Sequence, residues 1–412
     1  MLQAEDALVG AKNHQAAVRM AIIAFINTNI VLACIYGTFS VLLSGVESRL
    51  GVGLKLATLG IPVVNLAIAI CAPGVGVLAS RASLRLLMLV GACLGVAGFL
   101  LLAVTHSYLF YLLAYGLLIG PGMAVGVILP GTLVTRWFAV NRGKALGLVN
   151  TPIGLAIMPL AINWMLQKHG LTASYLALAG LSVVSVVANL FILDKPPGYE
   201  PARAVAHGGV AGMGMAELVR APRFWALLFA FIASSTSSVV LGAHMVPMAR
   251  SWNLSATQGA TMLATMSLVG IVGTLLYGWV ADRLGGALSI AFVVLVPAVL
   301  WLLLLAHPPF VEAVGLVGLI GLNGAGVVPV FSYALSEAFG RESFSRAYGV
   351  ANLINLPFSV ACVPVAAVIF MRTGSYNGAI IAVALFLCAT GLVALTARRR
   401  PPAVPVMVER FE

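Results

Sequence analysis

Twelve long apolar stretches, separated by short polar segments, make up most of this sequence. An α-helix needs about 20 apolar residues to cross the hydrocarbon core of a bilayer, and each stretch reaches that length. The composition agrees, because 61% of the residues are apolar and only 8% are charged, whereas a soluble domain carries about 25% charged residues. The sequence therefore predicts an all-α membrane protein with twelve transmembrane helices and excludes an ordinary soluble protein.

The twelve stretches form two sets of six on either side of a polar segment. The expected spans are 17–45, 55–79, 84–104, 108–136, 143–167 and 172–193, followed by 223–249, 257–281, 286–306, 311–338, 346–371 and 375–396. The predicted domains are an N-terminal tail (1–16), a six-helix bundle (17–193), a linker (194–222), a second six-helix bundle (223–396) and a C-terminal tail (397–412).

The distribution of Lys and Arg predicts how these spans are oriented. With both termini in the cytoplasm, 18 of the 23 basic residues fall in cytoplasmic segments. Positively charged loops of membrane proteins remain preferentially in the cytoplasm. We therefore expect a multi-pass protein of the cell inner membrane with both termini cytoplasmic.

The other charged and reactive residues exclude several classes of function. The net charge is +11, but the basic residues are scattered at the ends of apolar runs, which does not favour nucleic acid as a partner. The five cysteines all lie inside apolar runs without the spacing of metal ligands. The sequence also contains no nucleotide-binding loop and no catalytic triad, so we expect neither a cofactor nor an enzyme.

The two halves of the chain repeat one another. GVLASR at 76–81 returns as GWVADR at 278–283, 202 residues later. Arg142 and Arg346 open corresponding spans, 204 residues apart. A half-chain repeat in parallel orientation is typical of transporters built from two six-helix bundles, with the substrate bound near the bilayer midplane.

The repeated loop resembles the signature of the major facilitator superfamily, which has the form G-x-x-x-D-R-x-G. The second copy matches it in full at Gly278, Asp282, Arg283 and Gly285, whereas the first copy has Ser80 in place of the acid. The resemblance implies two pseudo-symmetric six-helix bundles and transport by alternating access, driven by an existing gradient. An acid at this position can sit near a helix N-terminus of the opposite half and pair with the arginine, so the copy with Ser80 is expected to form the weaker contact.

Shorter motifs resemble the monocarboxylate-porter and oxalate/formate-antiporter branch of that superfamily. They are Tyr36-Gly37-Thr38-Phe39, Arg136-Trp137-Phe138 with Arg142-Gly143, Arg223-Phe224-Trp225 and His244-Met245-Val246-Pro247. The likeness implies a small organic acid as substrate. However, Thr274 and Asn355 stand where antiporters of this branch carry basic residues, and Gly116 stands near the place of an arginine found in many proton-coupled members.

Polar residues well inside the spans are the candidates for substrate binding, because they are costly in a membrane. They are Asn29, Tyr36, Asn150, Thr151, Ser235, Ser238, His244, Asn323 and Asn355. No Asp, Glu, Lys or Arg lies at mid-depth, so the cavity is expected to be nearly neutral. Asn and Ser also form hydrogen bonds between packed helices, and this alternative remains open for Asn323 in particular.

His244 is the one candidate for proton coupling, because an imidazole titrates near neutral pH. A structural role near the bend at Pro247 is the alternative.

A second set of residues lies at the cytoplasmic ends of the spans, where they are expected to form a gate. These residues are Ser80, Arg81, Arg136, Arg142, Asp282, Arg283, Glu337 and Arg346. Their alternative role is to act as a topology signal alone.

The sequence thus predicts a monomeric secondary transporter in the lipid bilayer. Its leading substrate is a monocarboxylate, carried together with protons. Export of an amphipathic drug or metabolite through the same fold is the alternative.

Overall fold

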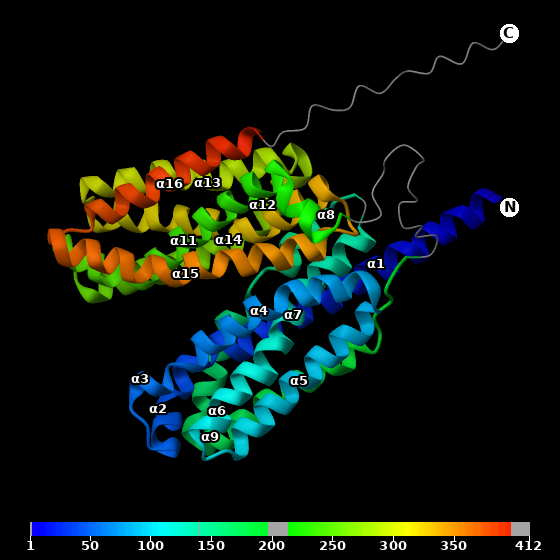
Figure 1. The fold of residues 1–412 in the computed structure, drawn as a ribbon, viewed down its shortest axis with the longest axis horizontal. Helices are drawn as coiled ribbons and strands as arrows, with labels where there is room; N and C mark the ends of the chain where they lie inside the picture. The colour runs from blue at the N-terminus through cyan, green and yellow to red at the C-terminus, as the bar shows by residue number, and fades with distance from the viewer. Residues whose placement is uncertain (1, 139, 197–212, 397–412) are drawn as a thin grey trace, which may run out of the picture.

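The computed structural model describes residues 2–138, 140–196 and 213–396, and these residues form an all-helical protein (Figure 1). The N-terminal half contains two π-helical segments, η1 and η2, besides its α-helices. Its elements are α1 Leu2–Leu32, η1 Ala33–Gly37, α2 Phe39–Leu50, α3 Leu54–Ala57, α4 Gly60–Arg81, α5 Leu84–Val104, α6 Tyr108–Leu113, η2 Ala114–Ile119, α7 Gly120–Trp137, α8 Arg142–Val149 and α9 Ile153–Asn189.

The C-terminal half has longer uninterrupted helices. Its elements are α10 Met215–Arg220, α11 Pro222–Ser251, α12 Ala256–Leu284, α13 Gly286–Leu303, the short 3-10 segment η3 Leu304–Ala306, α14 Phe310–Phe339, α15 Phe344–Thr373 and α16 Asn377–Thr396. Part of the expected linker (197–212) and the expected C-terminal tail (397–412) lie outside the described residues.

The expected twelve-helix fold is confirmed, with local changes. Eleven helical stretches among the described residues are long and apolar enough to cross a membrane. One of them, Arg142–Asn189, is 48 residues long. It is broken at Gly170, whose φ of 79° is outside the helical region, so it supplies two spans. The first expected span is not one straight helix either, because α1 passes into η1 before the chain turns at Thr38.

The two halves form separate bundles that meet at one end and diverge at the other (Figure 1). At the meeting end α8 packs against α12, and α4 packs against α15. We call this end the linker side, because the N-terminal bundle ends there and the C-terminal bundle begins there, and we call the opposite end the open side. A rigid-body rocking of two such bundles is the usual basis of alternating access.

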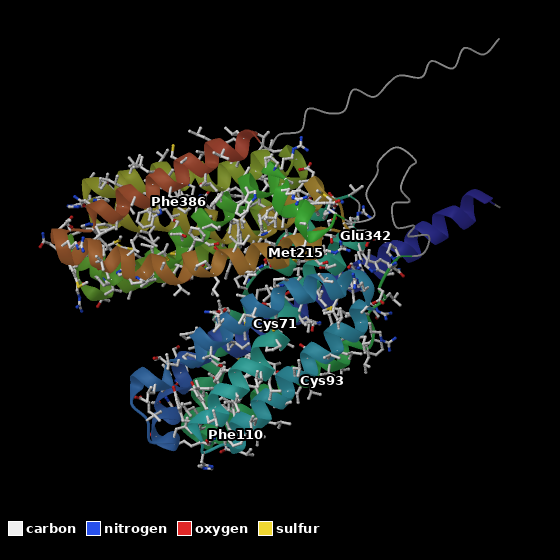
Figure 2. All side chains as sticks on the ribbon, viewed as in Figure 1. Cys71, Cys93, Phe110, Met215, Glu342 and Phe386 are labelled. Atoms are coloured by element: carbon white, nitrogen blue, oxygen red, sulfur yellow. The ribbon has the colours of Figure 1, made fainter. Side chains whose placement is uncertain are left out.

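The outer surface is apolar, as a membrane environment requires. Leu160 is 76% exposed and Val311 is 80% exposed. Figure 2 shows Phe110 and Cys93 on the outer surface of the N-terminal bundle, and both side chains are exposed. Such a surface is stable only when lipid covers it.

Candidate functional site

A central cavity of about 630 Å³ lies between the two bundles. Helices of both halves line it, and its lining is mostly apolar with a few polar groups. The polar side chains are Thr28, Tyr36, Asn65, Asn150, Thr274, Tyr348, Asn352, Asn355 and Ser359. No Asp, Glu, Lys, Arg or His occurs among these described lining residues, which agrees with the nearly neutral cavity expected from the sequence.

Two irregular helices position polar groups at this cavity. Asn150 follows the last residue of α8 and Pro152 precedes the first residue of α9, so the helix is interrupted beside the cavity. Tyr36 lies in the π-helical segment η1. Interrupted helices and π-bulges are frequent at membrane binding sites, because they free backbone groups and change the direction of side chains.

Most of the polar lining is already hydrogen-bonded within one bundle. The Tyr36 hydroxyl donates to Oδ1 of Asn65 at 2.6 Å. The amide nitrogens of Asn150 and Asn352 donate to the backbone carbonyls of their own helices, one turn earlier, at 2.8 and 2.9 Å. These bonds fix the side chains, but they leave the amide oxygens of both asparagines available as acceptors.

Two buried polar atoms on the cavity wall have no partner. Thr28 is 5% exposed, and its hydroxyl makes no hydrogen bond to the described residues. On the opposite bundle, Oδ1 of Asn355 is also buried without a partner. A buried polar atom left unpaired costs about 1–3 kcal/mol. Each half therefore holds one unpaired polar atom beside the cavity, and neither atom is accessible from the cavity in this conformation.

The floor of the cavity joins the two halves directly. The hydroxyls of Thr151 and Thr274 lie 3.1 Å apart and belong to different bundles. The sequence placed Thr151 among the substrate-binding residues, and the structure places it at this inter-bundle contact. Thr274 stands where antiporters of the resembling branch carry a basic residue, and here a neutral hydroxyl makes the contact between the bundles.

The remaining predicted binding residues lie behind the cavity wall. Asn29 accepts a hydrogen bond from the backbone N–H of Gly154 at 2.8 Å. Asn323 is buried against Tyr277, whose hydroxyl donates to it. Ser238 donates to the Ser234 carbonyl of its own helix at 3.1 Å. Neither these residues nor Ser235 line the central cavity.

His244 is also held within the C-terminal bundle. Its Nδ1 lies 3.3 Å from the Tyr376 hydroxyl, and its Nε2 lies 3.0 Å from the Val363 carbonyl oxygen. It is 7% exposed and does not line the cavity. The ring therefore connects α11 to α15 and to the loop before α16.

On the linker side, Asp282 connects the two bundles. Its carboxylate oxygens accept from the backbone N–H groups of Gly143 and Lys144 at 2.7 and 2.8 Å. Those groups belong to the N-terminal turn of α8, where a negative charge also interacts favourably with the helix dipole. The backbones of the two bundles also approach closely beside it, since a Cβ added to Gly143 would overlap the carbonyl oxygen of Gly278.

The corresponding contact of the first repeat is built differently. Ser80 accepts from Nε of Arg346 at 3.3 Å. The next residue toward the N-terminus of α15, Ser345, donates to the Gly76 carbonyl at 3.1 Å. Both repeats thus join the bundles at equivalent places, but only the second uses a carboxylate.

Of the other predicted gate residues, only Arg142 reaches across the bundles in the described contacts. It donates to Ser336 at 2.8 Å. Arg136 instead donates to the Ala79 carbonyl of its own bundle, and Arg283 stacks on Trp279 at 4.1 Å. Arg81 is exposed at the end of α4.

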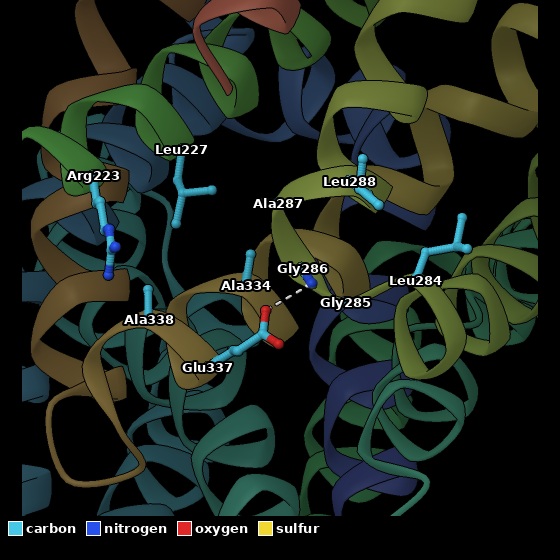
Figure 3. A pocket seen from close by; sticks show the side chains of 10 residues that line it. All are labelled: Arg223, Leu227, Leu284, Gly285, Gly286, Ala287, Leu288, Ala334, Glu337 and Ala338. Atoms are coloured by element: carbon cyan, nitrogen blue, oxygen red, sulfur yellow. Dashed lines mark hydrogen bonds between the residues drawn. The ribbon is translucent and has the colours of Figure 1, made fainter. Parts of the chain in front are cut away.

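Glu337 belongs to a second cavity, of about 290 Å³, inside the linker side of the C-terminal bundle (Figure 3). Its carboxylate accepts from the Gly286 backbone N–H at 2.7 Å and so fixes the start of α13. Arg223 and Leu227 of α11 line the other wall. This cavity shares no lining residue with the central one.

Helical spacing identifies the residues that the sequence prediction missed. Thr28, Leu32 and Tyr36 line the cavity at intervals of four, which places them on one helix face. Asn29 is one position further on and faces α9 instead. On α15, Asn352 and Ser359 flank Asn355 at intervals of three and four. The periodicity around Tyr36 and Asn355 was therefore the available signal.

Two bundles around a central neutral cavity, crossing the membrane twelve times, define a secondary transporter. The chain belongs to the Major Facilitator Superfamily, whose family model matches residues 24–355 and 227–410. Members of this family are transporters and not enzymes.

Several characterised relatives match most of the chain. The oxalate:formate antiporter of Oxalobacter formigenes is 25% identical over 317 residues, which cover 74% of this chain and 73% of the relative. Monocarboxylate transporter 13 of Bos taurus is 24% identical over 315 residues, covering 75% and 72%. Among solved structures, an Escherichia coli fucose:proton symporter superposes with a TM-score of 0.75 at 15% identity, covering 93% of this chain and 99% of that one. The last match supports the fold alone.

Proposed function

We propose that this transporter carries a small monocarboxylate across the inner membrane together with a proton, by alternating access. The observation that carries the proposal is the neutral polar cavity between the bundles. The names of the relatives support the substrate class, because an oxalate:formate antiporter and monocarboxylate transporters both move carboxylic acids.

The neutral lining favours symport with a proton. An unpaired carboxylate is costly to remove from water, and none of the described lining residues supplies a positive charge. A carboxylate that enters with a proton avoids this cost. Either the substrate itself or His244 can carry that proton.

The Lys and Arg distribution supports an orientation in which the linker side faces the cytoplasm. The inter-bundle bonds described above would then close the cytoplasmic side. A membrane-impermeant thiol reagent applied to cells should label a single cysteine at His106 on the open side and should spare one at Arg81.

Uptake by proteoliposomes tests the function. A panel of radiolabelled monocarboxylates is supplied at an outside pH of about 6 or about 7.5, with the inside held at about 7.5. We expect uptake above that of protein-free liposomes, stimulated by the acidic outside and abolished when a protonophore collapses the gradient. Uptake that ignores the gradient would refute symport, and no uptake of any acid would refute the substrate class.

Export of an amphipathic metabolite is the second candidate. The apolar part of the cavity wall, which includes Phe231 of α11 and Met123 of α7, favours it. A fujikurins efflux protein of Gibberella fujikuroi is 26% identical over 222 residues, although these cover only 52% of this chain and 45% of that protein. Competition of amphipathic neutral compounds against the acids distinguishes the two candidates.

A further inference from the structure

Helices α4 and α15 pack against each other on the linker side and separate toward the open side (Figure 1). A Cβ added to Gly76 of α4 would overlap the carbonyl oxygen of Ser345, and one added to Gly349 of α15 would overlap the carbonyl oxygen of Ala72. The two contacts lie one helical turn apart on each helix, in opposite directions along the chain. They therefore define an antiparallel pair and fix the faces on which it meets.

The same two faces continue into the central cavity. Seven residues beyond Ala72 and Gly349, or about two helical turns toward the open side, the faces carry Asn65 on α4 and Leu356 on α15. Both residues line the cavity, and so does Ser359, one turn further along α15. This part of the cavity is therefore the place where α4 and α15 come apart, with Asn65 and Ser359 on facing walls.

Each of these two side chains offers a hydrogen-bond donor to the cavity. Nδ2 of Asn65 and Oγ of Ser359 make no hydrogen bond to the described residues, and neither is among the buried unpaired atoms. In this they differ from the hydroxyl of Thr28 and Oδ1 of Asn355, which are closed off. The donors of Asn65 and Ser359 are thus accessible to a molecule in the cavity.

Tyr36 fixes the direction of the Asn65 amide. Its hydroxyl donates to Oδ1 at 2.6 Å, so the amide oxygen is engaged and the N–H₂ group is left for the cavity. A side-chain amide has one acceptor oxygen and two N–H donors on opposite ends. Tyr36 is therefore a positioning residue, because without its hydroxyl the amide is free to turn its oxygen toward the cavity.

We propose that the carboxyl group of the substrate binds between Asn65 and Ser359 and so joins α4 to α15. One carboxyl oxygen accepts from the Asn65 amide and the other accepts from the Ser359 hydroxyl, since both oxygens of a carboxyl group can accept. This inference rests on the proposed function and specifies where the acid group sits. The two bonds are completed as the helices approach, so the substrate favours closure of the open side.

The sequence of α15 assists this approach. Pro357 lies inside the helix, between Leu356 and Ser359. Proline has no N–H to bond to the Leu353 carbonyl one turn earlier, so the helix bends more easily there. The part of α15 that carries Ser359 can therefore tilt toward α4 at a lower cost than a regular helix would require.

Transport kinetics of variants test the site. Uptake of radiolabelled propionate and phenylacetate is measured in proteoliposomes of the full chain, at the acidic outside pH described above. Asn65→Leu keeps the side-chain size and should raise KM about 10- to 100-fold, and Ser359→Ala should raise it about 3- to 10-fold. Asn163→Leu, on the exposed surface of α9, is the matched control and should keep the original KM.

Thermal unfolding of each variant identifies any that fail to fold. Asn65→Ala is the second variant at that position, should Asn65→Leu not fold. A KM that stays unchanged in the folded variants of Asn65 and Ser359 would overturn the proposal.

Tyr36→Phe separates positioning from packing, because it keeps the ring and removes only the hydroxyl. It should raise KM about 3- to 10-fold and leave kcat nearly unchanged. Combined with Asn65→Leu it should have no further effect on KM, since the hydroxyl acts through the Asn65 amide. Additive effects in the double variant would contradict the positioning role.

Distances across the open side test whether the acid joins the helices. Once the native cysteines are replaced, spin labels are attached to cysteines introduced at Leu59, beside the start of α4, and at Met371, near the end of α15. Both positions are exposed. Propionate should add a shorter distance population in the otherwise native chain, but not in Asn65→Leu at the same concentration. Uptake of propionate without any shortening would overturn the proposal.

Flux and distance together separate this inference from the proposed function. If proteoliposomes take up acids but the variants keep the original KM, the function stands and the site is wrong. If propionate shortens the distance and Asn65→Leu prevents this, although no acid is taken up, the site stands and transport of monocarboxylates is refuted. If the acids cause neither uptake nor shortening, both are refuted.

Discussion

Asp282→Asn tests whether the bond between Asp282 and α8 holds the linker side closed. The carboxylate accepts two backbone N–H bonds, at 2.7 and 2.8 Å, from the N-terminal turn of α8 on the other bundle. Asparagine can accept one of them, but its amide N–H₂ faces the second N–H, so that bond is lost together with the charge. A hydrogen bond to a charged group contributes about 1.5–3 kcal/mol.

We expect the closed state to lose stabilisation near the lower end of that range, because Asp282 is only half-buried and α8 is a short helix. About 2 kcal/mol corresponds to a change of about 30-fold in the ratio of linker-closed to linker-open molecules. The variant should therefore populate a state in which the bundles approach each other on the open side.

Distances between spin labels on the open side measure this shift. The five native cysteines, of which Cys93 and Cys388 are exposed, are first replaced. Single cysteines are then introduced at His106 and Arg372, which lie at the open-side ends of the two bundles. Asp282→Asn should add a shorter distance population in the absence of substrate.

Glu337→Gln is the matched control for Asp282→Asn. Glu337 makes the same kind of bond, to the Gly286 N–H at 2.7 Å, but within one bundle. The Glu337→Gln variant should leave the distribution of spin-label distances unchanged. An unchanged distribution in Asp282→Asn, or an equal shift in both variants, would refute the assignment of Asp282 to the gate.

Three further variants test other contacts of the gate and of the C-terminal bundle. Ser80→Asp places a carboxylate beside the Arg346 guanidinium, so it should stabilise the linker-closed state by about 1 kcal/mol and slow transport; an accelerated turnover would contradict this. Gly143→Ala should prevent the close approach to Gly278 and abolish uptake while the protein still folds, as checked by thermal unfolding and by the same spin-label distances. His244→Gln should lower stability by about 1 kcal/mol through its lost bonds yet keep the pH dependence of acid uptake, and loss of that dependence would assign the proton to His244.

The sequence predicted the fold because its determinants are local. Span length, the basic residues between spans and the repeated loop each follow from short segments that the bilayer constrains directly. The motif around Asp282 also pointed to a helix N-terminus on the opposite half, through its resemblance to the loop signature of the superfamily. Ser80 was expected to form the weaker contact. It accepts one bond from the Arg346 guanidinium through a neutral hydroxyl.

The cavity was harder to predict, because it depends on helix rotation. Asn29 and Thr28 are neighbours, and nothing in their types reveals which one faces the substrate. Asn150 lies in the break between α8 and α9, where no regular helical repeat predicts which side a residue faces. His244 illustrates the same difficulty, since its partners, Val363 and Tyr376, lie more than a hundred residues away in sequence.

The bonds between the bundles set what a substrate must offset during alternating access. Opening the linker side breaks the bonds of Asp282, at a cost of about 2 kcal/mol, and also the contacts that Ser80, Arg142 and Thr151 make across the bundles. A ligand can shift this equilibrium only by the difference between its affinities for the two states. The substrate therefore offsets the loss of these bonds only if it binds more tightly to the state in which the bundles approach on the open side, whereas an empty cavity gains nothing from opening the linker side.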